Sequence, residues 1–498
     1  MQGLFVMKFY KDVANALLGI VLILVLCRFT MGGMAALLAL IGFVAALTRK
    51  SSIVACVFVL FPLFVIFNRA IIGVGGLTLL IAKFAFIAMA ISSSVSTVAK
   101  EHVRERLPIA WIGLYLVFSC ISSIDGWMPL ISFLKILNFA AMLMGIYMLS
   151  QELQTSFESL RAIRAIFMAM AIIMIIGSVI SYFVPSIGYS MLIFKLEGYG
   201  QFSTAEELLS RDGKVLFNGM TCHSQMLSPV VACLATWVLC DMLLIEKRMS
   251  LLHCIILAFA PILLYMSRSR GGLLMLVCVI VLTLCITIPK ARLSERVKHH
   301  MRILIAIATA VLLTAGVYSQ LRSDTISRWL RKTDDVASDQ RSLQEAFTGS
   351  RQALIEMNMR DFKSNPLFGK GFQVVDGMKE AYDAHQITWF SASVEKGVTP
   401  YVILGETGLM GAIAFLVFLA SFYSTCFKRG YMALMTNFTC FLVANLADST
   451  FFSPSGLGGF MWTVSCIGAF STDCLAKRIA SMWYDGSSFE VTAYGGRR

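Results

Sequence analysis

The chain has 498 residues, of which 58% are hydrophobic and 14% are charged, with a formal net charge of +13 and a mean hydropathy of +0.77. A soluble protein carries about 25% charged residues, so this composition excludes a soluble globular protein. The positive charge gathers in short connections between apolar runs, where it indicates membrane topology and not nucleic acid binding.

Apolar runs of about 20 residues recur along the whole chain, which is the length needed to cross a bilayer. Because the backbone inside hydrocarbon must satisfy its own hydrogen bonds, continuous apolar runs predict helices. We therefore predict an all-α polytopic integral membrane protein, a bundle of about 12–14 transmembrane helices. The predicted spans lie near residues 13–28, 31–48, 53–68, 76–92, 108–124, 129–149, 163–184, 224–244, 251–267, 271–288, 302–320, 399–422, 432–447 and 457–475.

Basic residues fill every second connection, as the positive-inside rule describes for cytoplasmic loops. Most of the opposite short connections carry little positive charge: Arg28 and Arg69 stand alone, and 125–128 and 448–456 contain no basic residue. Both termini are then expected in the cytoplasm. The basic connections contain Lys8/Lys11, Arg49/Lys50, Lys100/Arg104/Arg106, Arg161/Arg164, Lys247/Arg248, Lys290/Arg292/Arg296/Lys298, Lys428/Arg429 and Lys477/Arg478.

This alternation divides the chain into membrane segments and outer segments. The large outer loop carries 11 basic and 11 acidic residues, a balance that argues against a disordered charged tail. The predicted division is N-terminal transmembrane helices at 1–184, a first outer loop at 185–223, central transmembrane helices at 224–320, a large outer loop domain at 321–398, C-terminal transmembrane helices at 399–475 and a cytoplasmic tail at 476–498.

A helix is predicted inside the large outer loop. Ser350 can cap its start, and Asn365-Pro366 ends it, because the residue before a proline is pushed out of the helical region. Gly369-Lys370-Gly371 then predicts a tight turn, which lacks the spacing of a phosphate-binding loop. The 13 cysteines lie mostly inside apolar runs and show neither disulfide nor zinc spacing, so no metal site is predicted.

Arg268 and Arg270 are the first candidates for chemistry. They lie in Ser267-Arg-Ser-Arg-Gly-Gly-Leu, on the outer side where the topology otherwise avoids positive charge. Each arginine could simply extend its charge to the membrane interface. Guanidinium groups also bind phosphate bidentately, and the adjacent glycines leave room for a head group. A pyrophosphate ligand at the outer interface fits both facts.

The large loop supplies further candidates. Arg351 lies on the predicted loop helix, and His385 lies near the end of the loop. Glu395 lies just before the next span, where an interfacial carboxylate could accept a proton. The structural alternatives are a solvated charge for Arg351, a structural role for His385 and an ion pair with Lys396 for Glu395.

Three more residues could contact a ligand. His223 opens the span at 224–244, although a structural role explains it equally well. Glu406 lies inside an apolar run, and ionisable groups at membrane depth are costly and default to functional or paired roles. Asp448 stands at the outer end of the span at 432–447, where it or Glu406 could pair with an arginine.

Four short motifs lie around the large outer loop. They are Phe217-Asn-Gly-Met-Thr-Cys-His223, Ser269-Arg270-Gly-Gly-Leu, Gly349-Ser-Arg351 through Asn365-Pro-Leu-Phe-Gly-Lys-Gly-Phe372, and Glu395-Lys-Gly through Leu404-Gly-Glu406-Thr-Gly-Leu-Met-Gly411. In this order and position they resemble the O-antigen ligase and O-antigen polymerase superfamily of bacterial cell-envelope proteins.

The resemblance implies a glycosyltransferase in the bacterial inner membrane, with its large loop in the periplasm. Its donor would be a polyprenyl-diphosphate-linked oligosaccharide and its acceptor a growing glycan. An acceptor hydroxyl would attack the anomeric carbon, and Arg270 and Arg351 would hold the departing diphosphate. The resemblance implies no metal, other cofactor or nucleic acid; membrane lipid and a chain-length regulator protein are further expected partners. The expected substrate contacts are Arg268, His223, Glu406 and Asp448.

One position departs from the ligase pattern. Ligases of this superfamily carry a histidine at the position that Gly397 occupies here, nine residues before Glu406, and His385 lies too far upstream to align with it. This departure favours a polymerase that lengthens O-antigen or exopolysaccharide, with Glu395 or His385 as base.

Two alternative activities stay open, beside a bare membrane scaffold, which would not explain Arg268, Arg270 and Glu406 together. One is a ligase that transfers glycan to a lipid or protein acceptor, which shares every feature except the histidine. The other is a flippase or transporter of lipid-linked oligosaccharide. A flippase is expected to line its core with basic residues, whereas most charges here cluster at the outer interface and in the loop.

Overall fold

The computed structural model of the protein describes residues 2–30, 33–48, 51–66, 88, 105–154, 156–183, 217–221, 224–247, 250–267, 270–288, 299, 343–375, 397–446, 449–454 and 456–484. Within these ranges the regular elements are helices and none is a strand. The predicted all-α membrane fold is confirmed.

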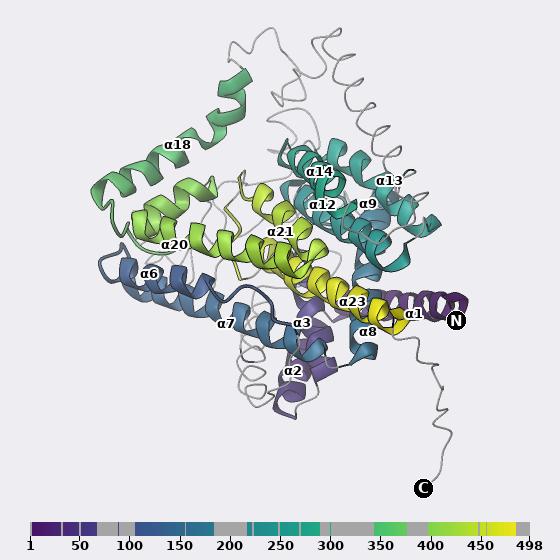
Figure 1. The fold of residues 1–498 in the computed structure, drawn as a ribbon. Helices are drawn as coiled ribbons and strands as arrows, with labels where there is room; N and C mark the ends of the chain where they lie inside the picture. The colour runs from purple at the N-terminus through teal and green to yellow at the C-terminus, as the bar shows by residue number, and fades with distance from the viewer. Residues whose placement is uncertain are drawn as a thin grey trace.

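The helices pack into one bundle, in which helices far apart in the sequence lie side by side (Figure 1). Short π-helical turns continue some of them without a break, so that α8, η1 and α9 form one long helix. The bounds are α1 Gln2–Phe29, α2 Gly33–Leu47, α3 Ser51–Ile66, α6 Ile112–Ile124, α7 Pro129–Leu153, α8 Phe157–Ala171, η1 Ile172–Ile176, α9 Gly177–Phe183, α12 Ser224–Asp241, η2 Met242–Glu246, α13 Leu251–Met266, α14 Arg270–Leu282, η3 Thr283–Thr287, α18 Leu343–Ser364, α20 Thr399–Arg429, α21 Met432–Ala444, α22 Leu457–Thr463, η4 Val464–Ala469 and α23 Phe470–Tyr484.

The predicted spans correspond closely to these helices. The predicted spans at 76–92 and 302–320 lie outside the described residues, apart from residue 88, which is helical. Five helices of the described part are long and apolar enough to cross a membrane: Lys8–Cys27, Pro129–Leu153, Phe157–Phe183, Met226–Glu246 and Thr399–Arg429.

The loop helix α18 differs from its prediction at one end. It begins at Leu343, so Ser350 lies inside the helix and does not cap it. Leu343-Gln-Glu-Ala are good helix formers and continue the helix backwards past Ser350. The predicted end is confirmed, because α18 stops at Ser364, directly before Asn365-Pro366.

Helix ends rich in polar contacts meet at one end of the bundle, which we call the basic end. There Glu105 accepts hydrogen bonds from Tyr431 and from Lys477 (3.0 Å) and lies 3.4 Å from Arg429. Burial alone would raise the pKa of Glu105, but these hydrogen bonds and the charges of Lys477 and Arg429 hold the pKa below its usual range. Further contacts at this end are Tyr10–Ser250, Asp12–Arg161 and Gln154–Arg478.

The other ends of the same helices meet at the opposite end of the bundle, which we call the loop end. Here the α6–α7 connection, the 366–375 segment and the start of α20 contact one another. Thr399 at the start of α20 donates its N–H to the carbonyl of Asn445, just after α21. The α6–α7 connection and the α20–α21 connection therefore lie at opposite ends, as the pattern of basic residues predicts for these two.

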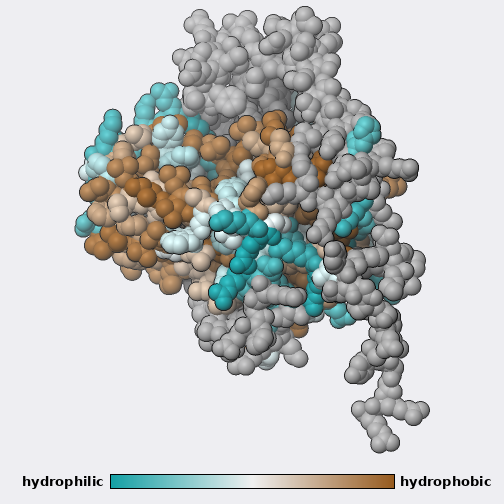
Figure 2. Space-filling view, in the orientation of Figure 1, coloured by the Kyte–Doolittle hydropathy of each residue, from teal (hydrophilic) through white to brown (hydrophobic). Residues whose placement is uncertain are grey.

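The side of the bundle formed by α6, α7 and α20 is apolar. Figure 2 shows hydrophobic residues covering the left of the molecule, where these three helices lie in Figure 1. Large exposed apolar side chains of these three helices include Val117, Ile124, Leu130, Leu137 and Leu416. Such a belt is expected where a helix bundle faces lipid.

Candidate functional site

Helix α20 is broken at the loop end. Gly408 has φ +61° and ψ −161°, which is not helical, and the helix resumes directly after it. The break leaves backbone carbonyls before Gly408 and N–H groups after it without helical partners. Irregular backbone at membrane depth is tolerated only where protein or water satisfies it.

A segment that follows α18 fills this break. The N–H groups of Lys370 and Gly371 donate to the carbonyls of Gly405 and Glu406, each at 3.0 Å. In return, the N–H of Leu409 donates to the carbonyl of Pro366 at 2.8 Å. Where the sequence predicts a tight turn, the chain bends at Lys370, and the flanking Gly369 and Gly371 have φ +72° and +105°. The large loop is thus anchored to α20 through main-chain hydrogen bonds.

Glycine is required where the two segments cross. A Cβ on Gly408 would overlap the carbonyl of Leu367, and a Cβ on Gly369 would overlap the carbonyl of Glu406. The Thr407-Gly408 and Phe368-Gly369 pairs of the sequence motifs therefore permit a close approach of two backbones.

We expect Gly408→Ala to lower the free energy of unfolding by about 2–4 kcal/mol, because it adds left-handed strain to a steric overlap. Gly430 is a matched control, since it has φ +72° but would place its Cβ in open space. Gly430→Ala should cost only about 1 kcal/mol. Thermal unfolding in detergent measures both, and equal losses would contradict a role for the crossing.

Glu406 lies at this crossing and is 1% exposed. Its Oε1 accepts the N–H of Gln373 at 2.9 Å, and its carbonyl accepts from the hydroxyl of Ser122 at the end of α6. The carboxylate that the sequence marked as costly is therefore bonded to the main chain of the loop segment.

The α6–α7 corner holds the same segment from the other side. Ser132 Oγ donates to the carbonyl of Phe372 at 2.8 Å, and Lys135 Nζ donates to the carbonyl of Gln373 at 2.9 Å. Lys135 is 4% exposed. Next to this segment, the rings of Tyr115 and Phe452 stack with their centroids 4.8 Å apart, so aromatic side chains line the site.

Arg351 lies on α18, which packs against α20. The contact between these helices is close at Gly405, where a Cβ would lie 2.9 Å from the carbonyl oxygen of Asn358. Arg351 precedes Asn358 by two helical turns, or about 10 Å along the axis, and it is partly exposed. The structure therefore puts Arg351 on the helix that covers the first turns of α20.

Arg270 is the first residue of α14, and only its backbone is described. Two residues on, a Cβ at Gly272 would overlap Ser228 Oγ of α12 and approach Leu264 of α13. Ser228 lies near the start of α12, whose other end leads through η2 to Ser250 at the basic end, so the start of α14 lies at the opposite end, the loop end. The candidates Arg268, His223, His385, Glu395 and Asp448 lie outside the described residues.

Among the described residues, no group of three or more His, Cys, Asp or Glu side chains is arranged to hold a metal ion.

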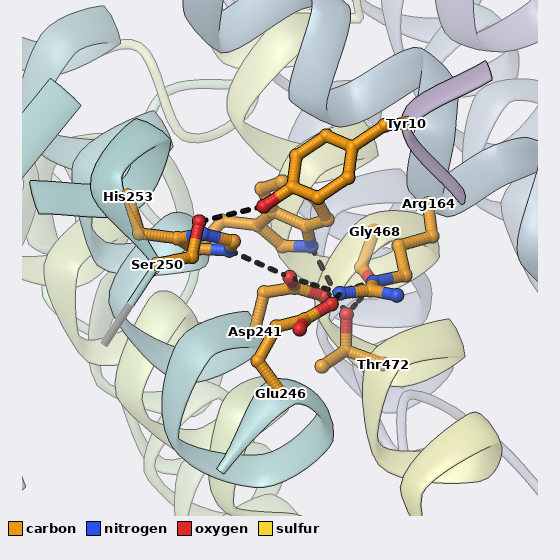
Figure 3. Close-up of polar contacts among 9 residues, drawn as sticks. Tyr10, Arg164, Asp241, Glu246, Ser250, His253, Gly468 and Thr472 are labelled. Carbon is orange, nitrogen blue, oxygen red and sulfur yellow. Dashed lines mark hydrogen bonds and ion pairs between the residues drawn. The ribbon is translucent and has the colours of Figure 1, made fainter. Parts of the chain in front are cut away.

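The structure also contains a buried charge cluster that the sequence analysis did not anticipate, at the basic end (Figure 3). Arg164 Nε and Nη2 donate to the two carboxylate oxygens of Asp241 at 2.6 and 2.8 Å, and Nη2 also donates to Glu246 at 2.5 Å. His253 Nε2 lies 3.1 Å from Asp241, and the Phe9 ring lies 3.7 Å from Arg164 Cζ. The cluster joins α1, α8, α12 and α13.

The rule that drew attention to Glu406, that an ionisable residue inside an apolar run is costly, could also have found this cluster and Lys135. Lys135, Asp241 and Glu246 each lie in or beside an apolar run, as Glu406 does. Arg164 was interpreted as a cytoplasmic topology signal, but its side chain is 1% exposed.

Part of the chain matches a known protein family. Residues 254–416 match the family described as O-antigen ligase. The match begins in α13 and ends in α20 beyond its break, and it includes Arg268, Arg270, Arg351 and Glu406. It confirms the resemblance to the O-antigen ligase and O-antigen polymerase superfamily. No curated protein matches the chain.

Proposed function

Because residues 254–416 carry the O-antigen ligase family segment, we propose that this membrane protein is a glycosyltransferase that polymerises lipid-linked oligosaccharide repeats. The donor is a polyprenyl-diphosphate-linked oligosaccharide, and the product is O-antigen or exopolysaccharide. The observation that carries the proposal is the family match, which spans the start of α14, the loop helix α18 and the break in α20.

In this proposal the diphosphate of the donor binds near Arg270 and Arg351. The hydroxyl of the acceptor glycan attacks the anomeric carbon of the donor, and the lipid diphosphate leaves with the bonding electrons. Two fixed guanidinium groups offset the charge that grows on the diphosphate. Arg268, His223 and Asp448 are proposed substrate contacts.

Glu395 or His385 is the proposed base that accepts the proton of the attacking hydroxyl. The arginines supply the charge stabilisation, so the reaction is proposed to be independent of metal ions. The buried carboxylate of Glu406, bonded to Gln373, supports a role in holding the site together and not in touching the glycan.

The proposed orientation follows from the basic residues. The basic end faces the cytoplasm, and the loop end faces the periplasm in the bacterial inner membrane. Both termini are cytoplasmic, and the substrates arrive from the periplasmic side. A chain-length regulator protein is a proposed further partner.

A polymerase is favoured over a ligase by the position where ligases of this superfamily carry a histidine. Gly397 occupies that position with φ +87°, and a Cβ there would lie 3.0 Å from the Cβ of Leu354. A histidine would be strained in this backbone conformation. The description of the family match keeps the ligase as the second candidate.

A gel profile of surface polysaccharide from cells with the gene deleted tests the proposal. A polymerase predicts loss of the ladder above a single repeat, with that one repeat still attached to its acceptor. Full-length polymer left on the lipid carrier would identify a ligase instead. An unchanged profile would contradict both the polymerase and the ligase and would favour a transporter.

A further inference from the structure

Gln373 has an unusual backbone conformation. Its φ is +53°, in the left-handed region that residues other than glycine seldom adopt. Non-glycine residues stay in this region when the surrounding structure holds them there, and such strain clusters at functional sites. Gln373 is 5% exposed, so protein surrounds it.

Three elements hold Gln373 through three separate hydrogen bonds. Its N–H donates to Glu406 Oε1 of α20 at 2.9 Å, and its carbonyl accepts from Lys135 Nζ of α7 at 2.9 Å. Its side-chain Nε2 donates to the carbonyl of Phe452 at 2.5 Å. We call Lys135, Gln373 and Glu406 the exit clamp.

The exit clamp directs two buried charges at the main chain of one residue. Lys135 is 4% and Glu406 is 1% exposed, and burying either charge is expensive unless hydrogen bonds compensate it. A neutral serine such as Ser132, which bonds the carbonyl of Phe372, would satisfy a peptide group at lower cost. We therefore infer that the charged partners serve to hold the backbone of Gln373 firmly in place.

The position of the exit clamp in the chain suggests what it fixes. Gln373 lies three residues before the 376–396 segment, which carries His385 and Glu395, the two proposed bases. The other end of that segment is also anchored, by Gly397 against Leu354 and by the hydrogen bond of Thr399 to Asn445.

We propose that Lys135 and Glu406 are positioning residues for glycan transfer, which hold Gln373 and so fix where the base-carrying segment leaves the bundle. The assignment deepens the proposed function and rests on it. Neither residue touches the substrate. Losing either bond removes one support of the Gln373 main chain, and a misplacement of about 1 Å at a reacting group can cost about 100-fold in rate.

The test measures kcat and the donor KM of purified full-length protein with a polyprenyl-diphosphate oligosaccharide. Lys135→Met and Glu406→Leu should each lower kcat by about 100-fold and change KM less than about threefold, because they act after binding. Glu406→Gln keeps an acceptor oxygen and should recover kcat to within about tenfold of wild type.

Two substitutions at Gln373 separate the effect of its backbone conformation from the effect of its side chain. Gln373→Gly and Gln373→Val both remove the side-chain bond to Phe452, but only glycine accepts φ +53° without strain. The glycine variant should keep kcat close to wild type, and the valine variant should lose it. Equal activity of the two variants would overturn the assignment.

Arg164→Met is the control for lost stability, since it removes a buried charge at the basic end. It should lower the melting temperature while leaving kcat per folded molecule unchanged. The same result for Lys135→Met and Glu406→Leu would overturn positioning in favour of a structural role. A raised KM with unchanged kcat would overturn it in favour of direct substrate contact. If the wild-type protein extends no donor, the proposed function fails and the positioning role fails with it. If the wild type is active but the variants behave otherwise than expected, only the positioning role fails.

Discussion

Cells that carry Arg270→Ala should make no glycan ladder, although the protein remains in the membrane at its usual level. The side chain would offset the charge that develops on the departing diphosphate, and removing one such group typically costs about 100- to 1,000-fold in rate. Arg270 opens α14 at the loop end, where the positive-inside rule gives no topological reason for an arginine. A gel profile of surface glycan beside an immunoblot of the membrane fraction measures both parts.

Two further variants sharpen this result. Arg270→Lys should restore the ladder only in part, because an ammonium cannot reproduce the bidentate fork of a guanidinium. Lys428→Ala removes an exposed charge at the basic end and should leave the ladder intact. A normal ladder in Arg270→Ala would rule out the proposed diphosphate site, and full activity with lysine would mean that charge alone matters.

The second large effect is expected at the buried charge cluster. Arg164→Met should lower the free energy of unfolding by about 3–5 kcal/mol, because it leaves the carboxylates of Asp241 and Glu246 buried without their guanidinium. It also removes the contact of Arg164 with the Phe9 ring, which joins α1 to α8. Thermal or denaturant unfolding of the purified protein in detergent measures the loss.

Arg161→Met is the matched control, one turn earlier on the same helix. Arg161 pairs with Asp12 at 2.7 Å, but these side chains are 13% and 26% exposed. Because this pair is partly exposed, solvent can compensate the Asp12 carboxylate in part, so this variant should lose less free energy of unfolding than Arg164→Met does. If Arg164→Met and Arg161→Met lost equal free energy of unfolding, burial would not explain the loss in Arg164→Met.

Hydropathy and charge predicted most of the described fold. The apolar run at 399–422 predicted α20. The basic residues Arg104/Arg106 and Lys428/Arg429 predicted that their two connections share one side, and the contact of Arg429 with Glu105 agrees. The break at Gly408 could not be predicted, because glycine is common inside membrane helices. The break depends on the 366–371 segment, which is distant in sequence and satisfies the interrupted backbone through tertiary hydrogen bonds.

The candidate site was predicted unevenly for a similar reason. Glu406 was found because a carboxylate inside an apolar run is costly, and the structure gives it a main-chain partner in Gln373. Lys135 was missed although it lies in an apolar run as Glu406 does, and nothing in the sequence indicates that its partner is Gln373, 238 positions later. Local sequence patterns identify ionisable residues that are costly to bury, but only the tertiary structure identifies their partners.

Reconstitution of the purified protein in lipid vesicles tests the central claim most directly. The vesicles would receive only polyprenyl-diphosphate-linked repeats, with a chelator present and without nucleotide. We predict a ladder of longer glycans still attached to the lipid diphosphate, with one free polyprenyl diphosphate released for each repeat added. Donor that crosses the bilayer unchanged, with no ladder and no released diphosphate, would contradict the account and identify a transporter.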